Sequence, residues 1–227
     1  MKSKLTKVVE ARFSLPLAAC LGATFSWDLL KVVLDGFHDN KEAWEMYHTI
    51  IFENTQKDEG QNDRGADHAL SKFGAVYTDN IMKVCVEQGL LECIGNPGGP
   101  YSFVHDKIQE AALALIPDDK LSEIQSMIGK ILFTTLTNDE LDQNCFLVSN
   151  LINPRLDLIA EKCKDEARRW RLVHLNHLSG TKAVRHSAFL AALTYFHTAI
   201  SLLPTNLGRN IMMSAWICFP PRQNVPM

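Results

Sequence analysis

Residues 100–116 read PYSFVHDKIQEAALALI, and this stretch decides the fold. Tyr101–Val104 is aromatic and β-branched and follows the turn Asn96–Pro100, so it predicts a short strand. A helix is expected to begin near His105 and to end at Pro117, because apolar residues recur at helical spacing between them. The predicted apolar face of this helix comprises Val104, Ile108, Ala111, Ala112 and Leu115.

The residues upstream complete a small module. Ile81–Leu91 has the same helical rhythm and leads into a short apolar segment, Leu90–Ile94. The predicted order is therefore helix, strand, glycine-proline turn, strand and helix. This order is the outline of a winged-helix module with a small β-hairpin wing, in a chain that is mainly α.

Two motifs resemble a known class of proteins. Phe103–Ala112 (FVHDKIQEAA) resembles the F-x-H-D-x-[IV]-Q-x-A-A segment of large signal-transducing ATPases of the AAA/STAND type. Those ATPases are often fused to a serine/threonine kinase domain and a hybrid histidine kinase. Leu17–Phe25 (LAACLGATF) is similar to the segment that opens their winged-helix part. The resemblance covers roughly residues 10–204.

The resemblance assigns a role to one histidine. In STAND proteins a histidine in a Met-His-Asp type motif reads the phosphate of bound ADP, and Val104-His105-Asp106 stands at the matching place. His105 is therefore the candidate cofactor-binding residue, as a nucleotide-phosphate sensor that Gln109 would support. The alternative is a histidine that caps its own helix or packs on the wing. That alternative is favoured for this chain alone, which lacks a phosphate loop.

Composition narrows the class of protein. The chain has 227 residues, 46% of them hydrophobic, which suffices for a sizeable core in two small modules. A net charge of −3 gives no electrostatic case for nucleic acid. The cysteines are scattered without a Cys-x-x-Cys pair, so we expect reduced thiols in a cytoplasmic protein. They are Cys20, Cys85, Cys93, Cys145, Cys163 and Cys218.

The N-terminus contains a misleading motif. Leu17–Cys20 looks like a lipoprotein cleavage box, but a signal peptide needs an uninterrupted apolar stretch of about 7–15 residues. Glu10 and Arg12 interrupt this one, which favours an amphipathic helix running into a loop. No segment approaches the roughly 20 apolar residues of a transmembrane helix, so no membrane insertion is expected.

Periodicity and capping signals predict the remaining elements before the central stretch. They are a helix over Lys7–Leu21 interrupted near Pro16, a helix over Trp27–Leu34 capped by Ser26, a helix over Glu42–Phe52, and a polar loop over Glu53–His68.

After the central stretch, the pattern predicts helices only. One runs to about Leu136 from a cap at Asp118 or Asp119, and the next covers Asn138–Asn153. A tetratricopeptide-like signature, A-x3-F-x2-A-x4-P, then follows Gly180 at the right distance, with Asp165–Thr181 as the partner helix. The signature residues are Ala192, Phe196, Ala199 and Pro204.

These elements group into domains. We predict a winged-helix-like domain over 1–117 with a polar loop insertion at 53–68, a helical connector over 118–163, and a tetratricopeptide-like helix pair over 164–204. Residues 205–227 lack caps and period and form an irregular tail. One hairpin cannot bury both its faces, so its exposed face should meet the preceding helices or further repeats.

Searches for catalytic motifs in the sequence find none. There is no G-x-x-x-x-G-K-[ST] phosphate loop, H-E-x-x-H zinc motif, G-x-S-x-G elbow or phospho-accepting histidine pattern. His174 and His177 lie one helical turn apart, but no third metal ligand is evident. We therefore expect no enzyme activity, catalytic residue, metal or bound cofactor in this chain, with ATP or ADP bound only by a parent ATPase.

The resemblance implies a non-catalytic regulatory segment linked to histidine kinase signalling and phosphorelay. It would relay nucleotide or ligand state by contacting other domains of the parent protein, or a protein partner, through the helical repeat. A stand-alone helical adaptor is one alternative. The other is a winged-helix DNA-binding regulator with Asn80–Leu91 as recognition helix, where Lys83 is offset by Asp79 and Glu87.

Overall fold

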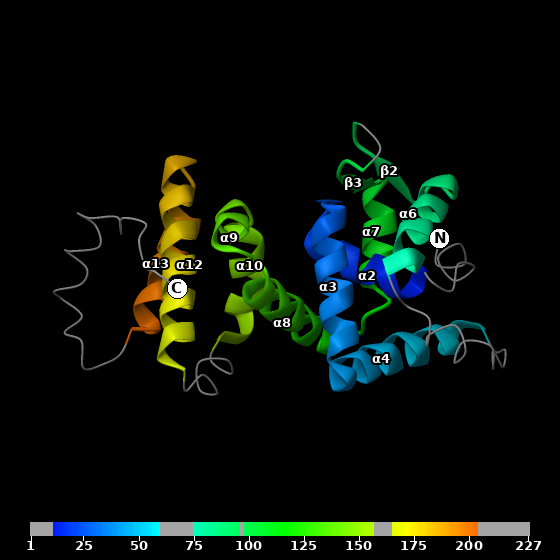
Figure 1. Cartoon of the computed structure of the whole chain (residues 1–227), viewed down its shortest axis with the longest axis horizontal. Helices are drawn as coiled ribbons and strands as arrows, with labels where there is room; N and C mark the ends of the chain where they lie inside the picture. Colours follow the sequence, from blue (N-terminus) through cyan, green and yellow to red (C-terminus); the bar gives the residue numbers. More distant parts are fainter. Residues whose placement is uncertain (1–10, 60–74, 96–97, 157–164, 204–227) are drawn as a thin grey trace. The chain divides into compact units, whose positions relative to one another are not determined.

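The computed structural model describes residues 11–59, 75–95, 98–156 and 165–203. Within these ranges the chain forms ten α-helices and one small three-stranded antiparallel sheet, which confirms a mainly α fold (Figure 1). The chain divides into two units: residues 1–137 with 150–154, and residues 138–149 with 155–227.

The first unit contains all three strands. Its elements are α2 (Ala11–Leu21), β1 (Thr24–Phe25), α3 (Trp27–Asp39), α4 (Lys41–Glu59), α6 (Ala75–Glu87), β2 (Leu91–Cys93), β3 (Tyr101–Phe103), α7 (Asp106–Leu113) and α8 (Asp118–Thr135). The helix α10 (Cys145–Ile152) contributes its last residues to this unit, followed by a 3-10 turn over Asn153–Arg155.

The sheet has the order β1-β3-β2, with every pair antiparallel. Phe25 lies opposite Tyr101, and Leu91 lies opposite Phe103. The chain order is a helix, the strand β1, further helices and then the hairpin β2–β3, with β3 in the middle of the sheet. This order is that of a winged helix. The predicted β-hairpin wing is confirmed.

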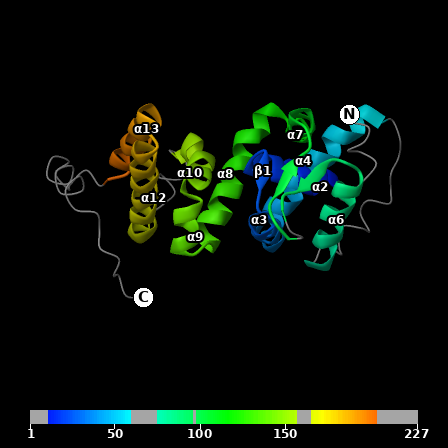
Figure 2. The ribbon, with the colours of Figure 1, turned by 90° about the horizontal axis from the view of Figure 1, so that it is seen from above.

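The helix α2 forms the centre of the first unit. All of its residues except Arg12 are buried, and it packs against α3, α4, α7 and β1 (Figure 2). The Tyr47 hydroxyl of α4 donates a buried hydrogen bond to the Phe13 carbonyl at 2.7 Å. The prediction of an amphipathic helix interrupted at Pro16 is wrong here, because the helix runs through Pro16 and neighbours cover every side.

The predicted polar loop after Glu53 is partly wrong. The polar loop predicted from Glu53 is helical as far as Glu59, and the Asn54 amide donates to the carbonyls of Ala114 and Leu115 at 3.2 and 3.0 Å. This contact gives the polar end of α4 a tertiary partner. The rest of the predicted loop, residues 60–68, lies outside the described residues.

The predicted caps have mixed outcomes. Ser26 caps α3 as expected, since its side chain accepts from the Asp28 N–H. Pro117, not an aspartate, occupies the cap position of α8 and makes no side-chain cap bond. Asp118 and Asp119 lie in the first turn instead, where they still suit the positive end of the helix dipole.

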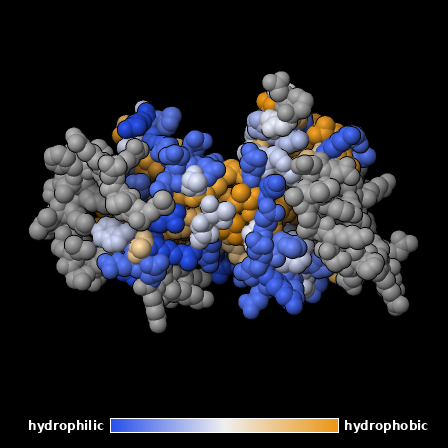
Figure 3. Space-filling view, viewed as in Figure 1, coloured by the Kyte–Doolittle hydropathy of each residue, from blue (hydrophilic) through white to orange (hydrophobic). Residues whose placement is uncertain are grey.

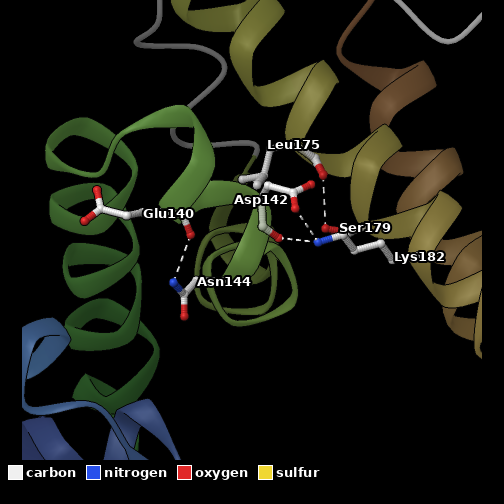
Figure 4. Close-up of polar contacts among 6 residues, drawn as sticks. All are labelled: Glu140, Asp142, Asn144, Leu175, Ser179 and Lys182. Atoms are coloured by element: carbon white, nitrogen blue, oxygen red, sulfur yellow. Dashed lines mark hydrogen bonds and ion pairs between the residues drawn. The ribbon is translucent and has the colours of Figure 1, made fainter. Parts of the chain in front are cut away.

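The second unit is helical throughout its described part. It contains α9 (Asn138–Gln143), the start of α10, α12 (Glu166–Arg185) and α13 (Phe189–Ser201). The single helix predicted over Asn138–Asn153 is wrong, because the structure has two helices here, α9 and α10, separated by a turn at Asn144. The side chain of this residue donates to its own i−4 carbonyl at Glu140, 2.8 Å away, and so competes with the helix ladder (Figure 4).

The α12–α13 hairpin confirms the predicted helix pair. Asp165 caps α12 by accepting from the Ala167 N–H at 3.0 Å, and the two helices lie side by side (Figure 1). A Cβ at Gly180 would come within 2.6 Å of the Phe196 ring, so only glycine allows this close approach. The predicted tail, residues 205–227, lies outside the described residues.

Polar contacts join α12 to α9, as Figure 4 shows, and a further contact joins α12 to α10. The Lys182 ammonium lies 2.9 Å from an Asp142 carboxylate oxygen and also donates to the Asp142 carbonyl at 2.5 Å. The hydroxyls of Ser149 and Ser179 are 2.9 Å apart and fully buried, and Ser179 also donates to the Leu175 carbonyl. These contacts attach the α12 side of the hairpin to α9 and α10.

Candidate functional site

His105 is the residue that the sequence singles out, and it lies exposed at the start of α7. Its backbone is extended, and its Nδ1 accepts a hydrogen bond from the Lys107 N–H at 3.1 Å. His105 is thus the N-cap of its own helix, as one of the two alternatives predicts. An accepting Nδ1 carries no proton, so the proton of the neutral ring is on Nε2.

The residues next to His105 stabilise α7 or attach it to the rest of the unit. Asp106 occupies the first turn of α7, and Lys107 pairs with Glu110 at 2.6 Å on the surface. Gln109 does not support His105: its amide donates to the Ala19 carbonyl of α2 at 3.2 Å, which ties α7 to the core helix. The role of His105 as a phosphate sensor stays a prediction.

The apolar face predicted for this helix is largely correct. Ile108, Ala112 and Leu115 are buried, whereas Val104 is half exposed. The Val104 N–H donates to the Leu90 carbonyl at 3.3 Å, so its backbone continues the hairpin. Its side chain therefore follows the alternation of a strand, opposite to Phe103, and leaves the helical stripe.

The helix α13 presents a different kind of surface. One side of it is buried in the hairpin at Ala192, Tyr195 and Ala199, and the ring of Tyr195 lies 5.9 Å from that of Phe146. A second series recurs at i, i+4, i+7 and i+11, the spacing of one helix face. Its members are Phe189, Leu193, Phe196 and Ile200.

This second series is largely uncovered among the described residues. Phe189 is 62% exposed, Leu193 is 60% exposed and the adjacent Leu190 is 83% exposed. Phe196 and Ile200 are half-buried. Phe196 packs on Gly180 of α12 and so belongs to the inner side of α13. We call the three exposed residues Phe189, Leu190 and Leu193 the outer stripe. No Asp, Glu, Lys or Arg occurs from Phe189 to Leu203, so the helix lacks the charges of an ordinary solvent face.

The exposed large apolar residues described in the first unit are spread over several elements, whereas α13 carries three of them. Val86 lies on α6, Ile94 follows β2 and Val104 follows β3. Figure 3 shows apolar side chains (orange) reaching the surface in the region of β2 and α6, while hydrophilic side chains (blue) cover α3. Single exposed apolar residues of this kind are normal on protein surfaces. The outer stripe is the more concentrated surface.

Sequence reasoning found only half of α13. The tetratricopeptide spacing identified the side that packs on α12, including Ala192 and Ala199. The outer stripe was missed, although its spacing is visible in the sequence, because a single helical repeat was expected to be completed elsewhere. Two apolar series on one uncharged helix indicate a helix built for neighbours on two sides.

Cys20, Cys85 and Cys145 are free thiols in the part of the chain that the structure describes. Burial raises the pKa of Cys20 and of Cys85 to about 12, so both thiols stay protonated at neutral pH and are poor nucleophiles. Cys145 is buried, and Cys93 is half-buried. The predictions for Cys163 and Cys218 fall outside the described residues.

His174 and His177 lie on α12. Burial lowers the pKa of His177, and the charge of His174 lowers it further. Across the described ranges no three residues among His, Cys, Asp and Glu come together as metal ligands. In the same ranges no helix has both the length and the apolar character to cross a membrane.

Comparison with known proteins gives one informative similarity. The chain is 34% identical over 119 residues to hybrid signal transduction histidine kinase G of Dictyostelium discoideum. The match covers 45% of this chain and 3% of the kinase, so the chain spans a small part of that protein's length. No protein-family profile matches the chain, and no solved structure matches it.

Proposed function

We propose that the chain is a non-catalytic regulatory segment of a signal-transducing protein of the hybrid histidine kinase type. The observation that carries this proposal is the 34% identity to the Dictyostelium kinase, a protein far longer than the chain. The HDKIQ motif around His105 is consistent with it, since this motif resembles a segment of signalling ATPases that are fused to such kinases.

The proposed mode of action is protein–protein contact. The outer stripe of α13 supplies an apolar, uncharged helix face, and apolar helix faces bind partner helices or grooves through residues spaced at i, i+4 and i+7. In a parent protein, a neighbouring domain would cover Phe189, Leu190 and Leu193 in one signalling state and release them in another.

The ATPase part of the parent protein would bind the nucleotide. In this proposal His105 senses ATP or ADP held by a phosphate loop elsewhere, and it donates from Nε2 while Nδ1 keeps its cap bond to Lys107. Removing the imidazole would then cost both the cap and the phosphate contact. His105→Asn is a useful variant because asparagine is a good helix cap but cannot reproduce the imidazole donor.

A full-length transcript read across the locus tests the proposal. An open frame that joins this chain to a phosphate loop or to histidine kinase and receiver sequences supports it. A frame that contains neither on either side contradicts it and favours the stand-alone adaptor.

The ADP affinity of the joined protein then tests His105. We expect His105→Ala and His105→Asn both to weaken ADP binding, with His105→Asn keeping the stability of the unchanged protein. Equal ADP affinity in all three proteins would leave His105 as a helix cap only.

A further inference from the structure

We draw no further inference here: the strongest candidate, the apolar face of α13 on which Phe189, Leu190 and Leu193 are exposed among the described residues, carries none because nothing in the structure shows what covers it.

Discussion

The helices α2 and α13 have similar compositions and opposite surroundings. α2 carries one charged residue, Arg12, and buries every other residue among α3, α4, α7 and β1. α13 carries no charged residue, yet only its inner side is buried in the hairpin. An apolar helix is stable in water only when neighbours cover it on each apolar side. The comparison teaches that α13 is built for one more neighbour than the described residues provide.

The largest expected effect tests the burial of α2. Leu17→Ala should lower the free energy of unfolding by about 2–5 kcal/mol, because it opens a cavity beside a side chain that has no exposed surface. Leu190→Ala on α13 is the matched control and should change it by less than about 0.5 kcal/mol. Urea unfolding followed by tryptophan fluorescence measures both. Equal losses would mean that Leu190 is as buried as Leu17.

The next effect tests the inner side of α13. Gly180→Val should destabilise the hairpin by about 1–3 kcal/mol, since a Cβ there would meet the Phe196 ring at 2.6–2.9 Å. Adding Phe196→Ala should recover part of the loss, and a double-mutant cycle gives the coupling between the two positions. Independent, additive effects would show that the helices are farther apart than the structure has them.

A smaller effect tests the polar tie between α4 and α2. Tyr47→Phe should cost about 1 kcal/mol, because the Phe13 carbonyl loses its buried hydroxyl donor at 2.7 Å. Burial also raises the pKa of Tyr47 well above its ordinary value. The hydroxyl should therefore show no tyrosinate absorbance up to pH 10 in the folded protein. A normal titration of all tyrosines would contradict this burial.

The smallest effect concerns pH and the hairpin. The pKa of His177 is lowered in the folded state, so the unfolded chain binds this proton more readily. Neutral His177 therefore does not reduce the free energy of unfolding above pH 6.5. Below pH 6.5 the unfolded chain takes up the proton first, so the free energy of unfolding falls. His177→Gln should flatten the pH dependence of the thermal midpoint between pH 7 and pH 5.

Local signals in the sequence were sufficient for much of the fold. Ser26 caps its helix as predicted, because a cap depends on residues within one turn. Asp165, predicted as the first residue of its helix, is the cap of α12. The wing hairpin and the close approach at Gly180 follow from turn residues and helical spacing. These features were predictable since each one is decided within a short segment.

Features that depend on distant residues were not predictable. The continuity of α2 through Pro16 depends on neighbours that cover it on all sides, and the extension of α4 accompanies the contact of Asn54 with the end of α7. At the candidate site, sequence patterns left two alternatives for His105, a phosphate sensor or a helix cap, and the structure shows His105 capping α7. The outer stripe was readable from its spacing, but its exposure required the structure.

The regulatory role is tested most directly by autophosphorylation of a histidine kinase that contains this segment. The rate is measured for the unchanged protein, for Leu190→Glu/Leu193→Glu and for the control Val86→Glu/Val104→Glu. We predict that the stripe variant changes the rate by about fivefold or more, the lower end of a typical allosteric coupling, and that the control does not. The same rate in all three proteins would contradict a role for α13 in signalling.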